Sequence, residues 1–135
     1  MIVALNNKSN LNIEEYKKYV EELSKIYFRG KLILCPNYLN LTEKVDILLG
    51  AQNVSPYTEG AHTGEIAASQ LSAIGVKYSI VGHSERRSIE SESEIFDKIK
   101  RLLENGMSPI LCVGEKQNER EKGATKAVLG KQLSS

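Results

Sequence analysis

One histidine of this sequence lies where an apolar segment gives way to a dense cluster of charge. Residues 78–87 read YSIVGHSERR, so His83 follows a strand-like run and a glycine. The end of a buried strand is the usual place for catalytic groups in α/β proteins. If a short helix begins after His83, its free N–H groups face the imidazole and favour the neutral ring, which can polarise a carbonyl oxygen. Taken alone, such a histidine is more often an ordinary surface residue of a charged loop.

Three further apolar segments end in polar or charged residues. They are residues 2–10 (IVALNNKSN), residues 49–55 (LGAQNVS), which lead into residues 60–66 (GAHTGEI), and residues 109–115 (PILCVGE). With IVGHSERR, and in this order and at these separations, they resemble the triosephosphate isomerases over essentially the whole chain.

The resemblance implies both a fold and a reaction. The expected fold is a parallel (β/α) barrel of the TIM type, here a partial barrel of about five β/α units in a single domain, residues 1–135. The expected reaction interconverts dihydroxyacetone phosphate and glyceraldehyde 3-phosphate through an enediol(ate), in glycolysis and gluconeogenesis. It needs no cofactor and no metal. The family works in the cytoplasm as a homodimer, so a second copy is an expected partner beside the phosphorylated triose.

The length of the chain opens two alternatives to an active enzyme. Its 135 residues are about half of a barrel that typically needs about 250. The family's general-base Glu follows the sixth strand, a lid comes after it, and phosphate-binding turns follow the seventh and eighth strands; none is expected here. The alternatives are a non-catalytic truncated fragment and a half-barrel assembly module that needs a partner chain, either a second copy or a complementing C-terminal half.

The resemblance assigns the reactive side chains. Lys8, His83 and Glu85 match the catalytic set, with His83 as the neutral electrophile and Glu85 paired with Lys8. Asn6, Lys8 and His83 match the substrate-binding set, and Ser84 matches the residue that contacts the resting base. Without the resemblance, a lysine just after a strand and a run of charge are usually solvated surface features.

A second group matches supporting and subunit-contact positions. Gln52 ends one of the strands, and Thr63 matches the residue that the family places beside the partner's site. Glu65 and Arg86 match an ion pair between subunits. Cys112 matches a position near the base that the family uses for packing. A buried cysteine often behaves as a small hydrophobe, which suits such a position. A nucleophilic pair of Cys112 with His83 is the less favoured reading.

The chain also departs from the family around its first strand. Leu5, Asn7 and Ser9 replace a usual Gly, Trp and Met. A leucine in place of glycine adds a side chain where the backbone packs closely, and overpacking costs about 1–3 kcal/mol.

Composition excludes several classes of function. The net charge of +1 provides no broad field for nucleic acid or an acidic membrane. No apolar run approaches the roughly 20 residues that span a bilayer, and the N-terminus has no signal-peptide layout, which favours the cytoplasm. Cys35 and Cys112 lack CxxC spacing, so reduced thiols and no metal site are expected.

Apolar periodicity predicts strands that alternate with helices. The predicted strands are residues 2–5, 32–35, 47–52 and 76–81, and a fifth that begins at Pro109. The predicted helices are residues 13–27 after an Asn12 cap, residues 65–74, a helix that follows the Ser91–Glu94 capping box and runs to Glu104, and residues 117–132. The gap before the third strand is short, so residues 42–46 give one helical turn at most. This order is typical of a parallel sheet with right-handed crossovers.

Overall fold

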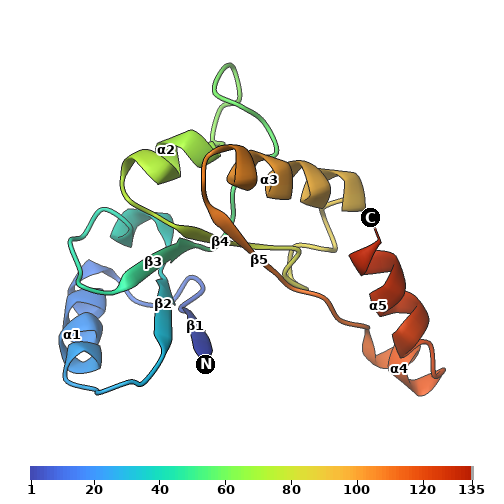
Figure 1. The fold of residues 1–135 in the computed structure, drawn as a ribbon, viewed down its shortest axis with the longest axis horizontal. Coiled ribbons are helices and arrows are strands. Elements are labelled where there is room, and N and C mark those ends of the chain that lie inside the picture. The colour runs from blue at the N-terminus through green and yellow to red at the C-terminus, as the bar shows by residue number, and fades with distance from the viewer. Residues whose placement is uncertain (135) are drawn as a thin grey trace.

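Five parallel strands form one sheet in the order β1-β2-β3-β4-β5 in the computed structural model, which describes residues 1–134. The strands are β1 (Ile2–Asn6), β2 (Lys31–Cys35), β3 (Leu48–Ala51), β4 (Tyr78–Val81) and β5 (Ser108–Leu111). Each strand pairs with the next one along the chain, and the sheet curls into an arch (Figure 1). The predicted partial barrel of about five β/α units is confirmed.

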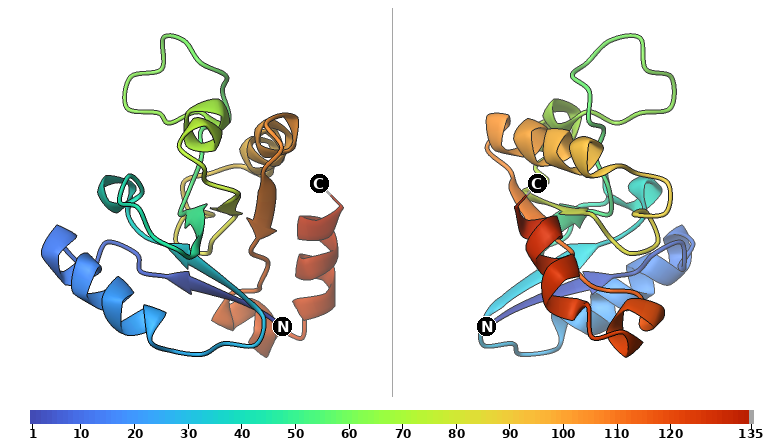
Figure 2. Two further views of the ribbon diagram at one scale, coloured as in Figure 1. Left: turned by 60° about the vertical axis from the view of Figure 1, so that its left-hand side comes forward. Right: turned by 90° about the vertical axis from the view of Figure 1, so that its right-hand side faces the viewer.

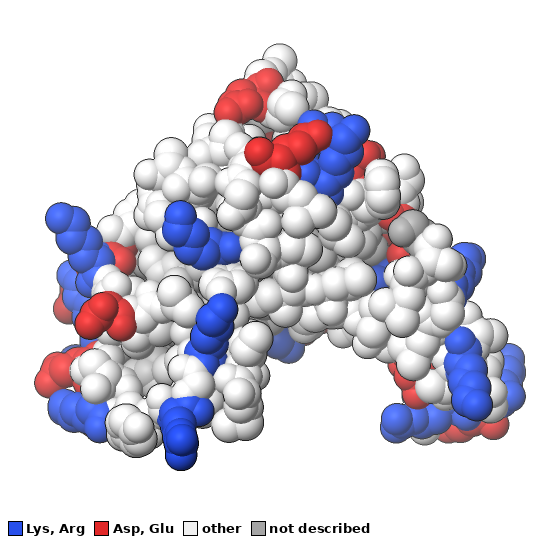
Figure 3. All heavy atoms as spheres, in the orientation of Figure 1, with Lys and Arg blue, Asp and Glu red and all other residues white. Residues whose placement is uncertain are grey.

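The helices lie on the outside of this arch. They are α1 (Ile13–Ser24), the short 3₁₀ helix η1 (Tyr38–Asn40), α2 (Ala68–Ala73), α3 (Glu92–Glu104), α4 (Gln117–Glu121) and α5 (Thr125–Leu133). Helices α2 and α3 lie side by side over the sheet, and α4 and α5 stand at one end of the arch (Figure 2). The space-filling view shows a hollow between that end and the one formed by α1, β1 and β2 (Figure 3). None of the helices in residues 1–134 is long and apolar enough to cross a membrane.

The two faces of the sheet carry different apolar clusters. The outer cluster joins the sheet to α2 and α3 and includes Val81, Leu71 and Leu102. The inner cluster contains the buried residues Ile33, Cys35 and Ile80, with Tyr78, Ile110 and Cys112 packed against them. Alternate residues of a strand point to opposite faces, so the apolar run at the end of β4 supplies both clusters. The arch is therefore packed outside by helices and inside by strand side chains alone.

Two predicted helix starts are confirmed by their caps. The amide oxygen of Asn12 accepts the N–H groups of Glu14 and Glu15, and the Glu15 carboxylate accepts the N–H of Asn12. Ser91 and Glu94 form the same reciprocal pair at the start of α3. These caps satisfy N–H groups that the first turn of a helix leaves free.

Helices α1 and α2 are shorter than predicted. Helix α1 ends at Ser24 rather than at residue 27, because Ile26 and Tyr27 are exposed and lack a buried face. The predicted helix 65–74 begins only at Ala68, because Ile66 is held extended by the N–H of Ser55, which donates to its carbonyl at 2.9 Å.

The connection between β2 and β3 also differs from prediction. Its single helical turn is η1, which precedes residues 42–46 because the side chain of Asn37 caps it. The predicted helix 117–132 is two helices, since Gly123 adopts a φ of +68° that interrupts a right-handed helix.

Candidate functional site

The carboxyl ends of β1, β3 and β4 meet at a cavity of about 520 Å³. Six of the predicted residues line it: Asn6, Lys8, Gln52, His83, Glu85 and Arg86. Ser9, Tyr38, Asn53 and Ile89 complete the lining. Ser84 and Cys112 line a neighbouring cavity of about 440 Å³, which also reaches His83. The sequence therefore identified most of the polar residues at this edge of the sheet.

A tight turn presents Lys8 at the end of β1. The backbone of Lys8 has a φ of +51°, a left-handed conformation that costs a non-glycine residue about 1–3 kcal/mol. The amide oxygen of Asn6 accepts the N–H of Lys8 at 3.0 Å. Gln52 donates from its Nε2 to the carbonyl oxygens of Lys8 (2.8 Å) and Cys35 (2.9 Å). Two amide side chains thus hold the backbone that carries the cation.

The departure at Leu5 does not disturb β1. Leu5 pairs with Leu34, and Asn6 pairs with Cys35, in unbroken parallel register. Asn6 therefore remains at the carboxyl end of the strand.

Lys8 and Glu85 form an ion pair between β1 and the turn after β4. Lys8 Nζ lies 2.7 Å from Glu85 Oε1. The hydrogen bond from Lys8 holds the pKa of the Glu85 carboxyl below its usual value. Both side chains are about half exposed, so the pair adds little to folding. It places a fixed cation at the mouth of the cavity.

The turn after β4 orients the imidazole of His83. The N–H of Glu85 donates to His83 Nδ1 at 3.3 Å. A ring nitrogen that accepts an N–H carries no proton, so this contact favours the neutral ring with its proton on Nε2. The carboxylate of Glu85 also approaches, with Oε2 at 3.5 Å from Nδ1. The two groups of Glu85 favour opposite tautomers at the same nitrogen.

The prediction of a short helix directly after His83 is wrong, because no regular helix begins there. Residues 84–89 form hydrogen-bonded turns instead, in which Arg87 N–H donates to His83 O at 3.0 Å and Glu90 N–H to Arg86 O at 2.9 Å. One backbone N–H near the start of these turns, that of Glu85, does face the imidazole and donates to its Nδ1.

A buried ion network supports the cavity from below. Arg86 Nε donates to Glu90, and Lys98 Nζ lies 2.5 Å from the same Glu90 oxygen. Lys98 also donates to Asn53 Oδ1 at 2.8 Å. The side chains of Glu90 and Lys98 are only 5% and 3% exposed, and buried charges require such partners. Sequence reasoning missed both residues; the i,i+4 spacing of Arg86 and Glu90 was the available signal.

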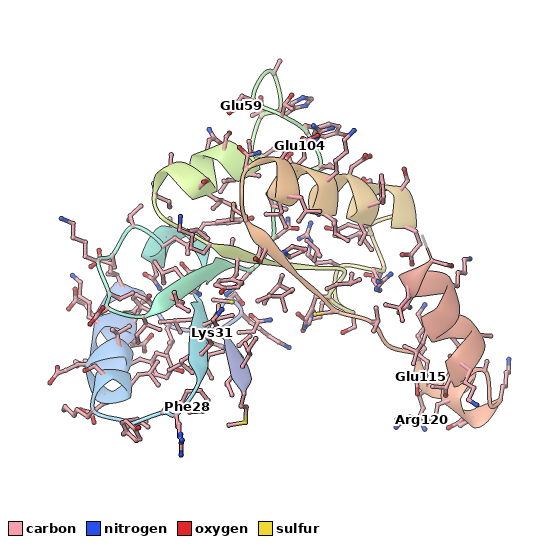
Figure 4. The ribbon with its side chains drawn as sticks, viewed as in Figure 1. Phe28, Lys31, Glu59, Glu104, Glu115 and Arg120 are labelled. Atoms are coloured by element: carbon pink, nitrogen blue, oxygen red, sulfur yellow. The ribbon has the colours of Figure 1, made fainter. Side chains whose placement is uncertain are left out.

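The loop that carries Thr63 and Glu65 projects away from the sheet. Both residues are exposed. The loop's outer part includes Glu59, labelled at the top of Figure 4. Within the loop, the rings of Tyr57 and His62 stack at a centroid distance of 4.1 Å. The structure therefore does not bring Thr63 or Glu65 to the cavity of their own chain.

The two thiols are packing groups in this structure. Burial raises the pKa of Cys35 to about 12 and also raises the pKa of Cys112. A raised pKa disfavours the thiolate, which is the nucleophilic form. The described residues contain no group of three or more His, Cys, Asp or Glu side chains that could hold a metal ion.

Comparison with known proteins shows which family this sequence is similar to. The family model described as "Triosephosphate isomerase" matches residues 1–135. A protein named triosephosphate isomerase from Clostridium novyi (strain NT) is 41% identical over 142 residues, covering 98% of this chain and 57% of that relative. One of the same name from Aquifex aeolicus (strain VF5) is 39% identical over 143 residues, covering 98% of this chain and 58% of the relative. The chain thus spans a little over half the length of these curated relatives.

Proposed function

The chain belongs to the triosephosphate isomerase family, and on that premise we propose that it carries the electrophilic half of an isomerase site. The proposed reaction interconverts dihydroxyacetone phosphate and glyceraldehyde 3-phosphate through an enediol(ate), in the cytoplasm. The observation that carries the proposal is the joint placement of Lys8 and His83 at one cavity, each held by Glu85. We propose that residues 1–135 belong to one partial-barrel domain.

The chemistry follows from where negative charge develops. Removal of a proton from the carbon beside the carbonyl of the triose places charge on the carbonyl oxygen. A hydrogen bond from His83 Nε2 and the ammonium of Lys8 would stabilise that oxygen as it becomes an enediolate. Such preorganised donors are usually the largest single contribution to catalysis. The amide of Asn6 lies beside them and is assigned to substrate binding.

The proposal assigns no base among residues 1–134. By resemblance, the family's base is a Glu that follows a sixth strand, whereas the described sheet has five. Ser84 would contact that base, and its position on the second cavity next to Cys112 is compatible with this role. The complete site therefore depends on further strands, either from a longer form of this protein or from a separate chain.

A half-barrel assembly module is the second candidate function. In the described sheet, β1 and β5 each pair on one side only. Unpaired strand edges and exposed apolar surface favour association. The occupant could be a second copy, with the loop of Thr63 and Glu65 as a further contact, or a complementing C-terminal half.

Arg86 bears on the dimer contact expected by resemblance. In this structure its guanidinium is bound to Glu90 of the same chain. A contact with Glu65 of another copy would therefore add a second carboxylate to a guanidinium that is already paired.

One experiment separates the enzyme from the module. The 135-residue chain is purified free of host isomerase and assayed for triose phosphate isomerisation alone and with a separately produced C-terminal half of a relative. The enzyme proposal predicts slow isomerisation alone and a large increase on mixing. Stable association without any increase would favour the module. A near-normal rate for the chain alone would show that another carboxylate serves as the base.

A further inference from the structure

Arg87 connects three elements, two through its side chain and one through its backbone N–H. Its Nη1 lies 2.5 Å from Oε1 of Glu92, at the start of α3, and its Nη2 donates to the carbonyl oxygen of Cys112 at 3.1 Å, just beyond β5. Its backbone N–H donates to the carbonyl of His83 at 3.0 Å. The side chain is only 12% exposed. The side chain is therefore largely buried and links separate elements, unlike the side chains of a solvated charged turn.

The guanidinium also lies against the backbone that carries His83. Gly82 has a φ of +66°, and a Cβ there would lie 2.9 Å from Arg87 Nη2 and 3.1 Å from the oxygen of Cys112. This close approach is possible only because the residue before His83 is a glycine. Arg87 thus supports the Gly82 backbone through packing and the His83 carbonyl through its own N–H.

The geometry suits an arginine better than a lysine. A guanidinium presents several N–H groups in a rigid plane, so it can bind the Glu92 carboxylate and the Cys112 carbonyl at the same time. A lysine ammonium is a flexible point charge and would not hold both partners in one orientation. Arg87 does not line the cavity that contains Lys8 and Glu85.

We propose that Arg87 is a positioning residue that keeps the His83 imidazole in its neutral, Nε2-protonated orientation. The nitrogen Nδ1 lies 3.3 Å from the Glu85 N–H and 3.5 Å from the Glu85 carboxylate, so a small shift of the turn decides which one it meets. The N–H favours an unprotonated Nδ1, whereas the carboxylate favours a protonated one. Arg87 holds the turn so that Nδ1 accepts the N–H of Glu85. The inference rests on the proposed function, since His83 is the electrophile there.

The test reads His83 directly in the substrate-free chain. The chain contains only two histidines, His62 and His83, so ¹⁵N-labelled imidazoles give one signal set for the site and one for an internal reference. The variant is Arg87→Lys. The matched control is Arg101→Lys, which removes a similar guanidinium–carboxylate pair (Arg101 Nη1 to Glu104 Oε2, 2.6 Å) from α3.

We expect the native chain and the Arg101→Lys control to show His83 as one neutral tautomer, protonated on Nε2. In Arg87→Lys, His83 should show mixed tautomers or a shift of the proton to Nδ1, with the His62 signals unchanged. Hydrogen exchange of the Glu85 amide should also accelerate, by up to about tenfold, as expected when its hydrogen bond to the neutral imidazole is lost.

Unchanged His83 signals and unchanged Glu85 exchange in a folded Arg87→Lys chain would overturn the proposal. If that variant does not fold, Glu92→Gln decides, because it weakens one of the two side-chain anchors. Faster Glu85 exchange in Glu92→Gln supports the proposal, and native exchange refutes it. The measurement needs no substrate, so its outcome is independent of catalytic activity. A chain that fails to isomerise triose phosphates can still show or lack the effect of Arg87.

Discussion

Replacement of Gly82 by alanine should destabilise the chain more than an equivalent replacement elsewhere. The new methyl group would lie 2.9 Å from Nη2 and 3.3 Å from Cζ of Arg87, and 3.1 Å from the carbonyl oxygen of Cys112. The left-handed φ of +66° adds a conformational cost of about 1–2 kcal/mol for alanine. Displacement of the guanidinium and the end of β5 adds about 1–3 kcal/mol, the usual range for overpacking.

Gly106 provides a matched control for the conformational cost. It has the same φ of +66°, and a Cβ there would meet nothing within 4 Å. Urea unfolding of Gly82→Ala and Gly106→Ala measures the conformational cost and the overpacking cost. The near-ultraviolet circular dichroism of the six tyrosines monitors the transition. The free energy of unfolding of Gly106→Ala should fall only by the conformational cost, and that of Gly82→Ala should fall by about 1–3 kcal/mol more. Equal losses would show that Arg87 and Cys112 do not pack against Gly82 as described.

Three further results are expected. Glu85 has a folded-state pKa below its ordinary 4.5. The ion pair with Lys8 therefore contributes to stability above pH 4.5, and this contribution is lost as the pH falls through the folded pKa. The free energy of unfolding should consequently fall less steeply with decreasing pH in Glu85→Gln. A thiol reagent at pH 8 should modify the partly exposed Cys112 before the buried Cys35, whose modification should follow unfolding, and equal rates would contradict the packing. Sedimentation should find the isolated chain associated or loosely packed, whereas a rigid monomer with sharp cooperative unfolding would refute the open half-barrel.

The sequence predicted those features that depend on local patterns. The strand ends at Asn6, Gln52 and His83 follow from apolar runs that stop at polar residues, and the structure brings all three to one cavity. The helix starts at Asn12 and Ser91 follow from capping chemistry between residues three apart. Such signals lie within a few residues of one another, so they can be read from the sequence.

Features that depend on tertiary contacts could not be predicted in this way. The ties of Arg87 to Cys112, 25 residues away, and of Lys98 to Asn53, 45 residues away, follow from how the strands pack. The late start of α2 depends on a backbone contact with Ser55 rather than on local propensity. Without the family resemblance, a run of charge such as residues 85–87 is typical of a solvated turn, although two of its three members take part in partly buried networks.

The central claim is that His83 and Lys8 form the electrophilic half of an isomerase site. Its most direct test is the isomerisation rate of the complemented protein, in which His83→Gln and Lys8→Met are compared with Lys100→Met on the exposed side of α3. We expect kcat to fall by about 10²–10³ in His83→Gln, the loss typical of removing one oxyanion donor, with a comparable loss in Lys8→Met and none in the control. A rate within about twofold of the parent for His83→Gln, far above the range for a lost donor, would show that His83 does not stabilise the developing oxyanion.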